Sequence, residues 1–216
     1  YFLIEVHYVR DLIKENQYET VYHEHLYYYS VTALNNLFKQ YDMTIIDVEE
    51  IPIHGGSIRV FVKNIKGDIN QKMQSRYLME KDLGLTSFNY FQDFGKKALQ
   101  HIEEVKNMLK KIKKESKTII GYGASGRGNI FCNLCGITPD IVDYIVDESS
   151  ERVGRYTAGT HIPIVSPEYM IGRKTDYIFI FAWNYSKMII NKLKGNNYKY
   201  IVAFPKINII CNDNVE

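Results

Sequence analysis

Apolar and polar residues alternate with a period of two in three stretches near the start of the chain, which is the pattern of β-strands with one buried face. The alternation predicts strands over residues 1–9, 44–50 and 57–63. The inward positions of the second and third strands are expected to be Ile46, Val48, Ile58, Val60 and Val62. Only residues 52–56 join these two strands, whereas a parallel crossover needs about a dozen residues, so we expect an antiparallel pair.

Helical spacing follows the first strand. Residues 11–20 are polar and are expected to form a connection, after which Ser30 resembles the N-cap of a helix that reaches Gln40. Its apolar face is expected to consist of Leu34, Leu37 and Phe38. Residues 66–116 also read as helical, with one apolar stripe formed by Ala98, Ile102, Val105, Leu109 and Ile112. We interpret the opposite, lysine-rich face of that stretch as solvated.

From residue 118 onward, strands and helices alternate. The pattern predicts strands over residues 118–121, 142–147, 162–165, 177–182 and 200–204. Helices are expected after the first of these as far as Gly136, from Ser166-Pro167 onward, and over residues 185–193. This succession predicts an α/β fold with an open, mainly parallel sheet. The chain therefore divides into residues 1–65, a helical linker over 66–116, and a Rossmann-like domain over 117–216.

The composition limits the possible partners. The 216 residues are 45% hydrophobic, enough for a core, and 27 basic against 25 acidic residues give a formal charge of +2. Neither nucleic acid nor a membrane is expected as a partner, because the charge is nearly balanced and no apolar run approaches the roughly 18 residues that cross a bilayer. Three cysteines are too few for a disulfide framework, which predicts a reducing, cytoplasmic location.

Two further features concern metals and chain ends. Cys132 and Cys135 have the spacing of a zinc knuckle but no second pair accompanies them, so we interpret them as buried helix thiols and predict no metal site. The chain starts without Met, inside an apparent core strand and with no basic leader. We interpret it as the later part of a longer protein.

The segment Tyr22-His23-Glu24-His25 places two imidazoles, a carboxylate and a phenol in four consecutive residues. Imidazole titrates near neutral pH, and a neighbouring carboxylate can fix its tautomer, so the cluster suits proton transfer. A metal held by His23 and His25 is an alternative, although the zincin pattern fails because Tyr27 stands where the second histidine would be. A second alternative is that these histidines only complete local hydrogen bonds and have no catalytic role.

The glycine-rich loop of residues 121–128 matches G-x-G-x-x-G, and Asp147 follows at the end of the next predicted strand. Such a loop lets backbone N–H groups approach a pyrophosphate at a helix N-terminus, and the acidic residue can accept from a ribose hydroxyl. Arg127 can add a charged fork to the phosphates. The loop indicates a dinucleotide or a nucleotide sugar, with glycines needed only for tight packing as the alternative.

The segment His54-Gly55-Gly56-Ser57 is similar to the oxyanion-hole segment of esterases. The matching nucleophile elbow is missing, because Arg127 occupies the final glycine position of the nearest candidate, Gly123-Ala124-Ser125. A hydrolase is therefore not favoured, and these glycines are expected to let a strand approach another backbone or a ligand.

Five motifs, taken in order, carry a family resemblance: residues 22–26 (YHEHL), 53–57 (IHGGS), 121–125 (GYGAS), 159–164 (GTHIPI) and 182–184 (AWN). In that order they resemble S-adenosylmethionine-dependent nucleotide-sugar C-methyltransferases over nearly the whole chain. The resemblance implies a zinc-binding segment, a methyl-donor domain of the class I methyltransferase fold and a Rossmann-like C-terminal domain. Residues 1–65 then correspond to the end of the donor domain, with zinc expected only upstream.

The resemblance also implies the roles of individual residues. His25 is the base that removes a proton beside a keto group, Glu24 orients it or polarises the site, and Tyr22 bonds the substrate or the oxyanion. The nucleoside-diphosphate sugar is expected to be bound by Gly121, Tyr122, Gly123, Ala124, Ser125, Arg127, Asn129, Asp147, His161, Trp183, Asn184, His54 and Ser57. The acidic-glycine loop that binds S-adenosylmethionine is not seen in these residues, so most of that site is expected elsewhere.

The sequence thus favours C-methylation of a keto nucleotide sugar by an enzyme of which this chain is a fragment, inactive alone. An NAD-dependent oxidoreductase that uses the glycine loop is the first alternative. A nucleotide-sugar-binding module without catalysis is the second. No oligomeric state is predicted.

Overall fold

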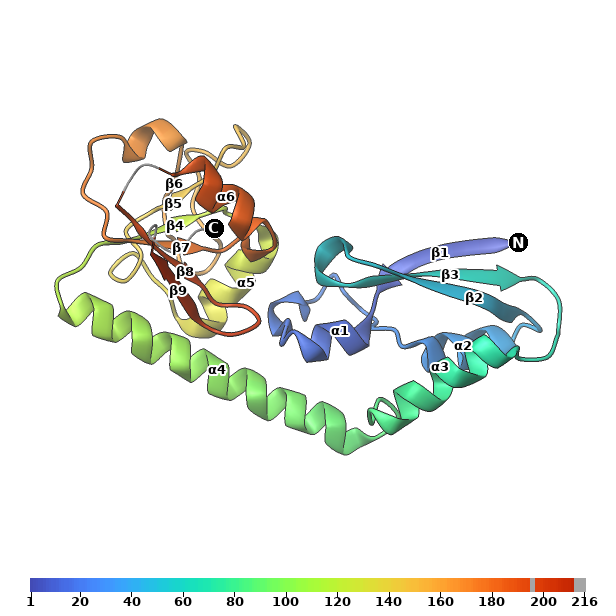
Figure 1. Ribbon diagram of the computed structural model, residues 1–216. Coiled ribbons are helices and arrows are strands. Elements are labelled where there is room, and N and C mark those ends of the chain that lie inside the picture. Colours follow the sequence, from blue (N-terminus) through green and yellow to red (C-terminus); the bar gives the residue numbers. More distant parts are fainter. Residues whose placement is uncertain (195–196, 212–216) are drawn as a thin grey trace. The chain divides into compact units, whose positions relative to one another are not determined.

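The computed structural model describes residues 1–194 and 197–211, and it forms two compact units, Tyr1–Lys97 and Ala98–Glu216. We call these unit 1 and unit 2. Each unit has its own sheet, and the predicted α/β fold is confirmed. The boundary between the units falls within one long helix, α4 (Phe88–Lys114), which Figure 1 shows as continuous.

Unit 1 contains a three-stranded antiparallel sheet in the order β1 (Phe2–His7), β3 (Ser57–Lys63), β2 (Thr44–Ile51). The predicted strands and their antiparallel pairing are confirmed. The inward face of β3 is as predicted, but that of β2 is not. A bulge between Ile45 and Asp47 turns Ile45 into the core together with Val48, whereas Ile46 was expected there.

Helices connect and cover this sheet. α1 (Val9–Lys14) and the short helix η1 (Tyr18–Thr20) occupy the stretch expected to be a plain connection. The predicted N-cap of α2 (Val31–Lys39) is confirmed, since Oγ of Ser30 accepts from the N–H of Ala33 at 3.0 Å. The predicted apolar face of α2 is correct for Leu34 and Phe38 but wrong for Leu37, which is 39% exposed.

Helix α3 (Gln71–Asp82) packs with α2 against the sheet of unit 1 (Figure 1). Its Glu80 is fully buried, and one carboxylate oxygen accepts from the Tyr8 hydroxyl at 2.8 Å and from the N–H of Val31 at 2.7 Å. The other oxygen accepts from the N–H of Thr32 at 2.8 Å. A carboxylate of α3 therefore caps the start of α2. The stretch expected to be a linker is thus divided between the units.

Unit 2 contains the predicted, mainly parallel sheet. Its strand order is β6 (Ile164–Val165), β5 (Ile145–Val146), β4 (Ile119–Tyr122), β7 (Tyr177–Ile180), β8 (Lys199–Val202) and β9 (Asn208–Cys211). The antiparallel edge strand β9 was not predicted. The order reverses between β4 and β7, which is where open α/β sheets bind ligands, outside the carboxyl ends of the strands.

The helices of unit 2 follow the predicted alternation with one exception. α5 (Gly126–Cys135) and α6 (Ser186–Lys192) are formed, the latter after a short η4 (Trp183–Tyr185). At Ser166-Pro167, where a helix was expected to begin, only the single-turn η3 (Pro167–Met170) forms. Cys132 and Cys135 are buried on α5, as predicted, and burial raises the pKa of the Cys132 thiol.

The C-terminal part of α4 contributes the predicted apolar stripe, all five members of which are buried. Beside that stripe, Nε2 of His101 bonds the Ala203 carbonyl at 2.9 Å, and its ring packs on Phe204. Across residues 1–194 and 197–211, no helix combines the length and apolarity needed to span a membrane.

Candidate functional site

The first predicted site, Tyr22 to His25, lies in the loop between η1 and α2. Nδ1 of His25 lies 2.8 Å from the Thr20 carbonyl, and Nε2 lies 3.1 Å from the Tyr22 hydroxyl. A carbonyl can only accept, so the proton of the neutral ring belongs on Nδ1 by this assignment. The lone pair is then on Nε2, and the half-buried His25 ring has the tautomer of a base that acts through Nε2.

Glu24 was expected to orient His25, and the structure gives that role to the Thr20 carbonyl instead. The Glu24 side chain is exposed, and no described residue forms a hydrogen bond or ion pair with it. His23 is exposed as well. Among residues 1–194 and 197–211, no three His, Cys, Asp or Glu side chains are grouped to hold a metal ion.

The second predicted motif of unit 1, His54 to Ser57, forms a tight turn beside this loop. Nε2 of His7 bonds the His54 carbonyl at 2.8 Å, and the His7 ring lies 6.3 Å from that of His25. Position 7 pairs with Ser57 across β1 and β3, which explains the proximity. The structure therefore brings the two motifs together around His7, a residue that the sequence analysis did not select.

Ser57 does not fit its predicted substrate-binding role. Its side chain is only 3% exposed, and Oγ donates to the Ile53 carbonyl at 3.3 Å. The hydroxyl therefore stabilises the turn from inside. His54, with φ of +53°, is an exposed residue of the turn, and its role as a substrate contact stays a prediction.

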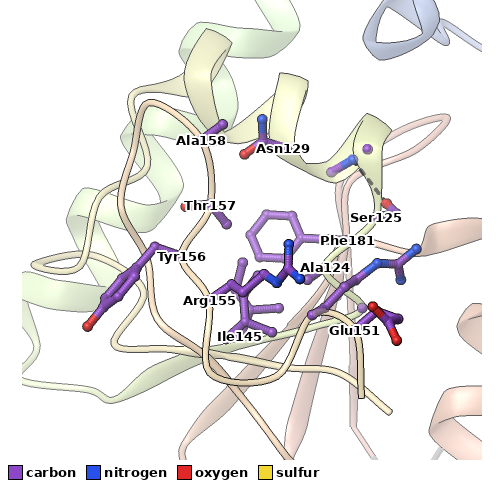
Figure 2. Close-up of a pocket in the computed structure, with 15 residues that line it drawn as sticks. Ala124, Ser125, Asn129, Ile145, Glu151, Arg155, Tyr156, Thr157, Ala158 and Phe181 are labelled. Carbon is purple, nitrogen blue, oxygen red and sulfur yellow. Dashed lines mark hydrogen bonds between the residues drawn. The ribbon is translucent and has the colours of Figure 1, made fainter. Parts of the chain in front are cut away.

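A pocket of about 340 Å³ lies in unit 2 at the carboxyl ends of β4 and β5, beside the N-terminus of α5 (Figure 2). It includes four of the predicted substrate-binding residues, Gly123, Ala124, Ser125 and Asn129, together with Gly126 of the same loop. It is completed by Gly128, Ile145, Glu151, Arg152, Arg155, Tyr156, Thr157, Ala158, Ile164 and Phe181. The pocket thus lies beside the reversal of strand order, where the fold predicts a ligand.

The glycine loop is shaped by close packing and by a helix cap. Gly123 has φ of +87°, and a Cβ placed on it would lie 2.6 Å from the Cβ of Ala182, so the loop after β4 touches the chain after β7. Oγ of Ser125 accepts from the N–H of Gly128 at 3.1 Å and caps α5. A Cβ on Gly126 would meet nothing within 4 Å, so the helix N-terminus is open to the pocket.

Asp147 has different partners from those expected. One carboxylate oxygen accepts from the N–H of Ala124 at 2.7 Å and lies 3.3 Å from Nη1 of Arg152. The other accepts from the N–H of Ser149 at 2.9 Å, and the residue is 6% exposed. Asp147 therefore braces the glycine loop. A dinucleotide fold would need this carboxylate as a free acceptor for a ribose hydroxyl, and the observed geometry does not favour that role.

The remaining predicted residues of unit 2 lie outside the pocket lining. Gly121 packs against Phe181 in the core, and the Tyr122 hydroxyl donates to Glu148 at 2.8 Å. Arg127 is not part of the pocket lining, and its guanidinium carbon lies 5.8 Å from the ring centroid of Trp183, which Asn184 follows in the sequence. His161 is exposed in a turn, with φ of +57°. Their substrate-binding roles stay predictions.

Arg155 is the cation that the sequence analysis missed. Figure 2 shows its side chain extending toward Ala124 and Phe181, while Tyr156 points away from them. No described residue forms an ion pair with the Arg155 guanidinium, and Arg155 lines the same pocket as the N-terminal residues of α5. The sequence did contain a signal for this cation, because the charged segment Glu151-Arg152-Val153-Gly154-Arg155 follows the end of a predicted strand.

Comparisons with known proteins agree with these features. The family model described as the C-methyltransferase C-terminal domain matches residues 52–205. A curated relative, C-methyltransferase NovU of Streptomyces niveus, is 29% identical over 214 residues. The alignment covers 97% of this chain and 51% of that protein, so the chain spans about half the length of this relative.

Proposed function

This chain belongs to the C-methyltransferase C-terminal domain family, and from that premise we propose that it takes part in methylating a carbon atom of a keto nucleotide sugar. In this proposal unit 1 carries the base, and the pocket of unit 2 binds a nucleoside diphosphate. The observation that carries the proposal is the bond from His25 to the Thr20 carbonyl, which leaves the Nε2 lone pair for proton removal.

The proposed step is proton abstraction. Nε2 of His25 takes a proton from the carbon beside the keto group, and the electrons of the broken C–H bond move onto the keto oxygen, giving an enolate. The imidazolium that forms keeps its Nδ1–H bond to Thr20. The Tyr22 hydroxyl, which contacts Nε2 before substrate binds, is then placed to donate to the oxyanion. The enolate carbon is the nucleophile for methylation.

S-adenosylmethionine is the donor that membership of the family suggests. The described residues of unit 1 form an antiparallel sheet with helices and contain no glycine loop between a parallel strand and a helix, the arrangement that holds a nucleotide. These residues do not fit the donor, so no step through it is assigned to them.

Unit 2 is proposed to hold the diphosphate. Backbone N–H groups at the open N-terminus of α5 attract anions, and the Arg155 guanidinium, which lines the same pocket, matches phosphate oxygens. The buried Oδ1 of Asn129, for which the described residues provide no donor, offers an acceptor to the nucleoside. The bracing role of Asp147 argues against NAD as the ligand.

The test compares His25→Gln with His23→Gln, which changes an exposed histidine two residues away. With the complete gene product and a panel of nucleoside-diphosphate keto sugars, we expect deuterium exchange beside the keto group to fall at least 100-fold in His25→Gln only. Calorimetric affinity for the nucleotide sugar should be unchanged in both. Equal exchange rates would remove His25 as the base, and binding without exchange by the unchanged protein would favour a non-catalytic module.

A further inference from the structure

Gln17 is a buried amide between the two motifs of unit 1. The residue is 1% exposed, and its Nε2 donates to the Gly55 carbonyl at 2.6 Å. A Cβ placed on Gly55 would lie 2.7 Å from that Nε2, so the amide lies flat against the glycine. No side chain larger than hydrogen at position 55 leaves room for this contact.

The backbone of Gln17 is connected to the base. Its carbonyl accepts from the N–H of Thr20 at 3.1 Å and from the Thr20 hydroxyl at 2.8 Å, which closes the single turn of η1. Thr20 is fully buried, and its own carbonyl accepts from Nδ1 of His25 and, at 3.1 Å, from the Tyr28 hydroxyl. The atom that fixes the tautomer of His25 therefore belongs to a turn that Gln17 holds.

The glycine turn is fastened at three consecutive carbonyls. Those of His54, Gly55 and Gly56 accept from His7 Nε2, Gln17 Nε2 and the N–H of Tyr8, respectively. The contact from Gln17 joins this turn to the residue that caps η1, whereas His7 and Tyr8 belong to the end of β1 and the residue after it. Gln17 thus couples the two motifs through one side chain.

We propose that Gln17 is a positioning residue for His25, an inference that rests on the proposed function. By holding η1 against the glycine turn, its amide keeps the Thr20 carbonyl aimed at Nδ1, so that the proton stays on Nδ1 and the lone pair stays on Nε2. Without the amide donor, η1 is free to shift and the ring samples both neutral tautomers. Small displacements of a catalytic group cost about 10- to 100-fold in rate.

The test uses Gln17→Met, which keeps the length of the side chain and removes the donor, in the complete gene product. Gln40→Met is the matched control, because Gln40 is exposed at the end of α2 in the same unit. We expect ¹⁵N NMR of the His25 ring to change from one Nδ1–H tautomer to a mixture in Gln17→Met only. Deuterium exchange beside the keto group should fall about 10- to 100-fold, with nucleotide-sugar affinity within about twofold.

If Gln17→Met does not fold, Thr20→Val decides the matter, since it removes the hydroxyl bond to the Gln17 carbonyl but keeps the Thr20 carbonyl. It should show the same loss of the single tautomer and a smaller loss of exchange. A single Nδ1–H tautomer and unchanged exchange in the folded variant would overturn the inference. If His25→Gln itself exchanges normally, the proposed function fails, and the tautomer measurement still decides whether Gln17 orients the ring.

Discussion

The two units carry sites that are built in opposite ways. In unit 1, the proposed base His25 lies on an irregular loop, and its position depends on individual hydrogen bonds from side chains to backbone carbonyls. In unit 2, the pocket is formed by backbone at the ends of parallel strands, and its shape depends on small residues packed at close range. Proton transfer needs one imidazole in one tautomer, whereas anion binding needs exposed N–H groups and a cation.

This difference makes the two sites separable. A change in the hydrogen bonds of unit 1 is expected to alter rate without affinity, and a change in the pocket of unit 2 is expected to alter affinity or stability without changing the tautomer of His25. Trp183 is the single tryptophan of the chain and lies in unit 2, so its fluorescence reports the unfolding of that unit.

The largest effect is expected from Gly123→Ala. The new methyl group would lie 2.6 Å from that of Ala182 at a φ of +87°, so overpacking and backbone strain act together and cost about 2–4 kcal/mol of unfolding free energy. The unfolding midpoint reported by Trp183 should fall by about 8 °C or more.

Gly126→Ala is the matched control, since its methyl group would meet nothing within 4 Å, and it should stay within about 0.5 kcal/mol of the original protein. Equal midpoints for the two variants would mean that the close approach of the loops after β4 and β7 does not hold the pocket together.

Arg155→Gln is expected to have the next largest effect. Losing a charge-assisted bond to phosphate, worth about 1.5–3 kcal/mol, should weaken calorimetric binding of a nucleoside diphosphate by about 10- to 100-fold. The His25 tautomer should not change. Arg173→Gln is the control, because Arg173 stacks on the Tyr169 ring outside the pocket lining. Identical affinities for both variants would exclude Arg155 as the phosphate ligand.

The smallest expected effect is that of acid on the stability of the two units. Burial lowers the pKa of His101, so the unfolded state takes up a proton first and unit 2 loses stability as the pH falls below about 6.5. In unit 1, the hydrogen bond from Arg10 is the main cause that lowers the pKa of Glu50 to about 2. The stability that ionised Glu50 contributes to unit 1 is therefore complete above about pH 4.5 and is lost only as the pH falls toward 2.

Thermal unfolding followed by Trp183 between pH 7 and 5 should therefore show a falling midpoint for unit 2. His101→Gln should flatten this dependence, because the titrating ring is gone. A dependence of the same slope in His101→Gln would assign the acid response to other groups.

The sequence predicted features that are encoded in residue type and spacing. The Ser30 cap, the alternation of Ile58, Val60 and Val62 and the βαβ order of unit 2 were all correct, because each depends on local periodicity or on one capping side chain. The bulge in β2 was missed because an inserted residue changes which face a side chain occupies without changing the composition of the strand.

The candidate site was predictable in part. Residues 121–128 identify the pocket, because a glycine loop between strand and helix has one geometry. The orienting partner of His25 was not predictable, since a carbonyl is present at every residue and leaves no mark in the sequence. Arg155 was not predicted for a related reason, because its place in the pocket depends on the path of the loop after β5. Arg127 was selected instead because it is adjacent to the glycine motif in the sequence.

The buried carboxylate of Glu80 bears on how such proteins can be recombined. It ties α3 to the first turn of α2, directly after the loop that carries His25, so α3 belongs to unit 1 although the sequence predicted a linker there. A chimera that exchanges unit 2 together with the whole of α4 should therefore be joined between α3 and α4, near residue 86. A junction at residue 65 would exchange α3 as well, so that the donors of Tyr8 and Val31 would depend on a foreign helix for their acceptor.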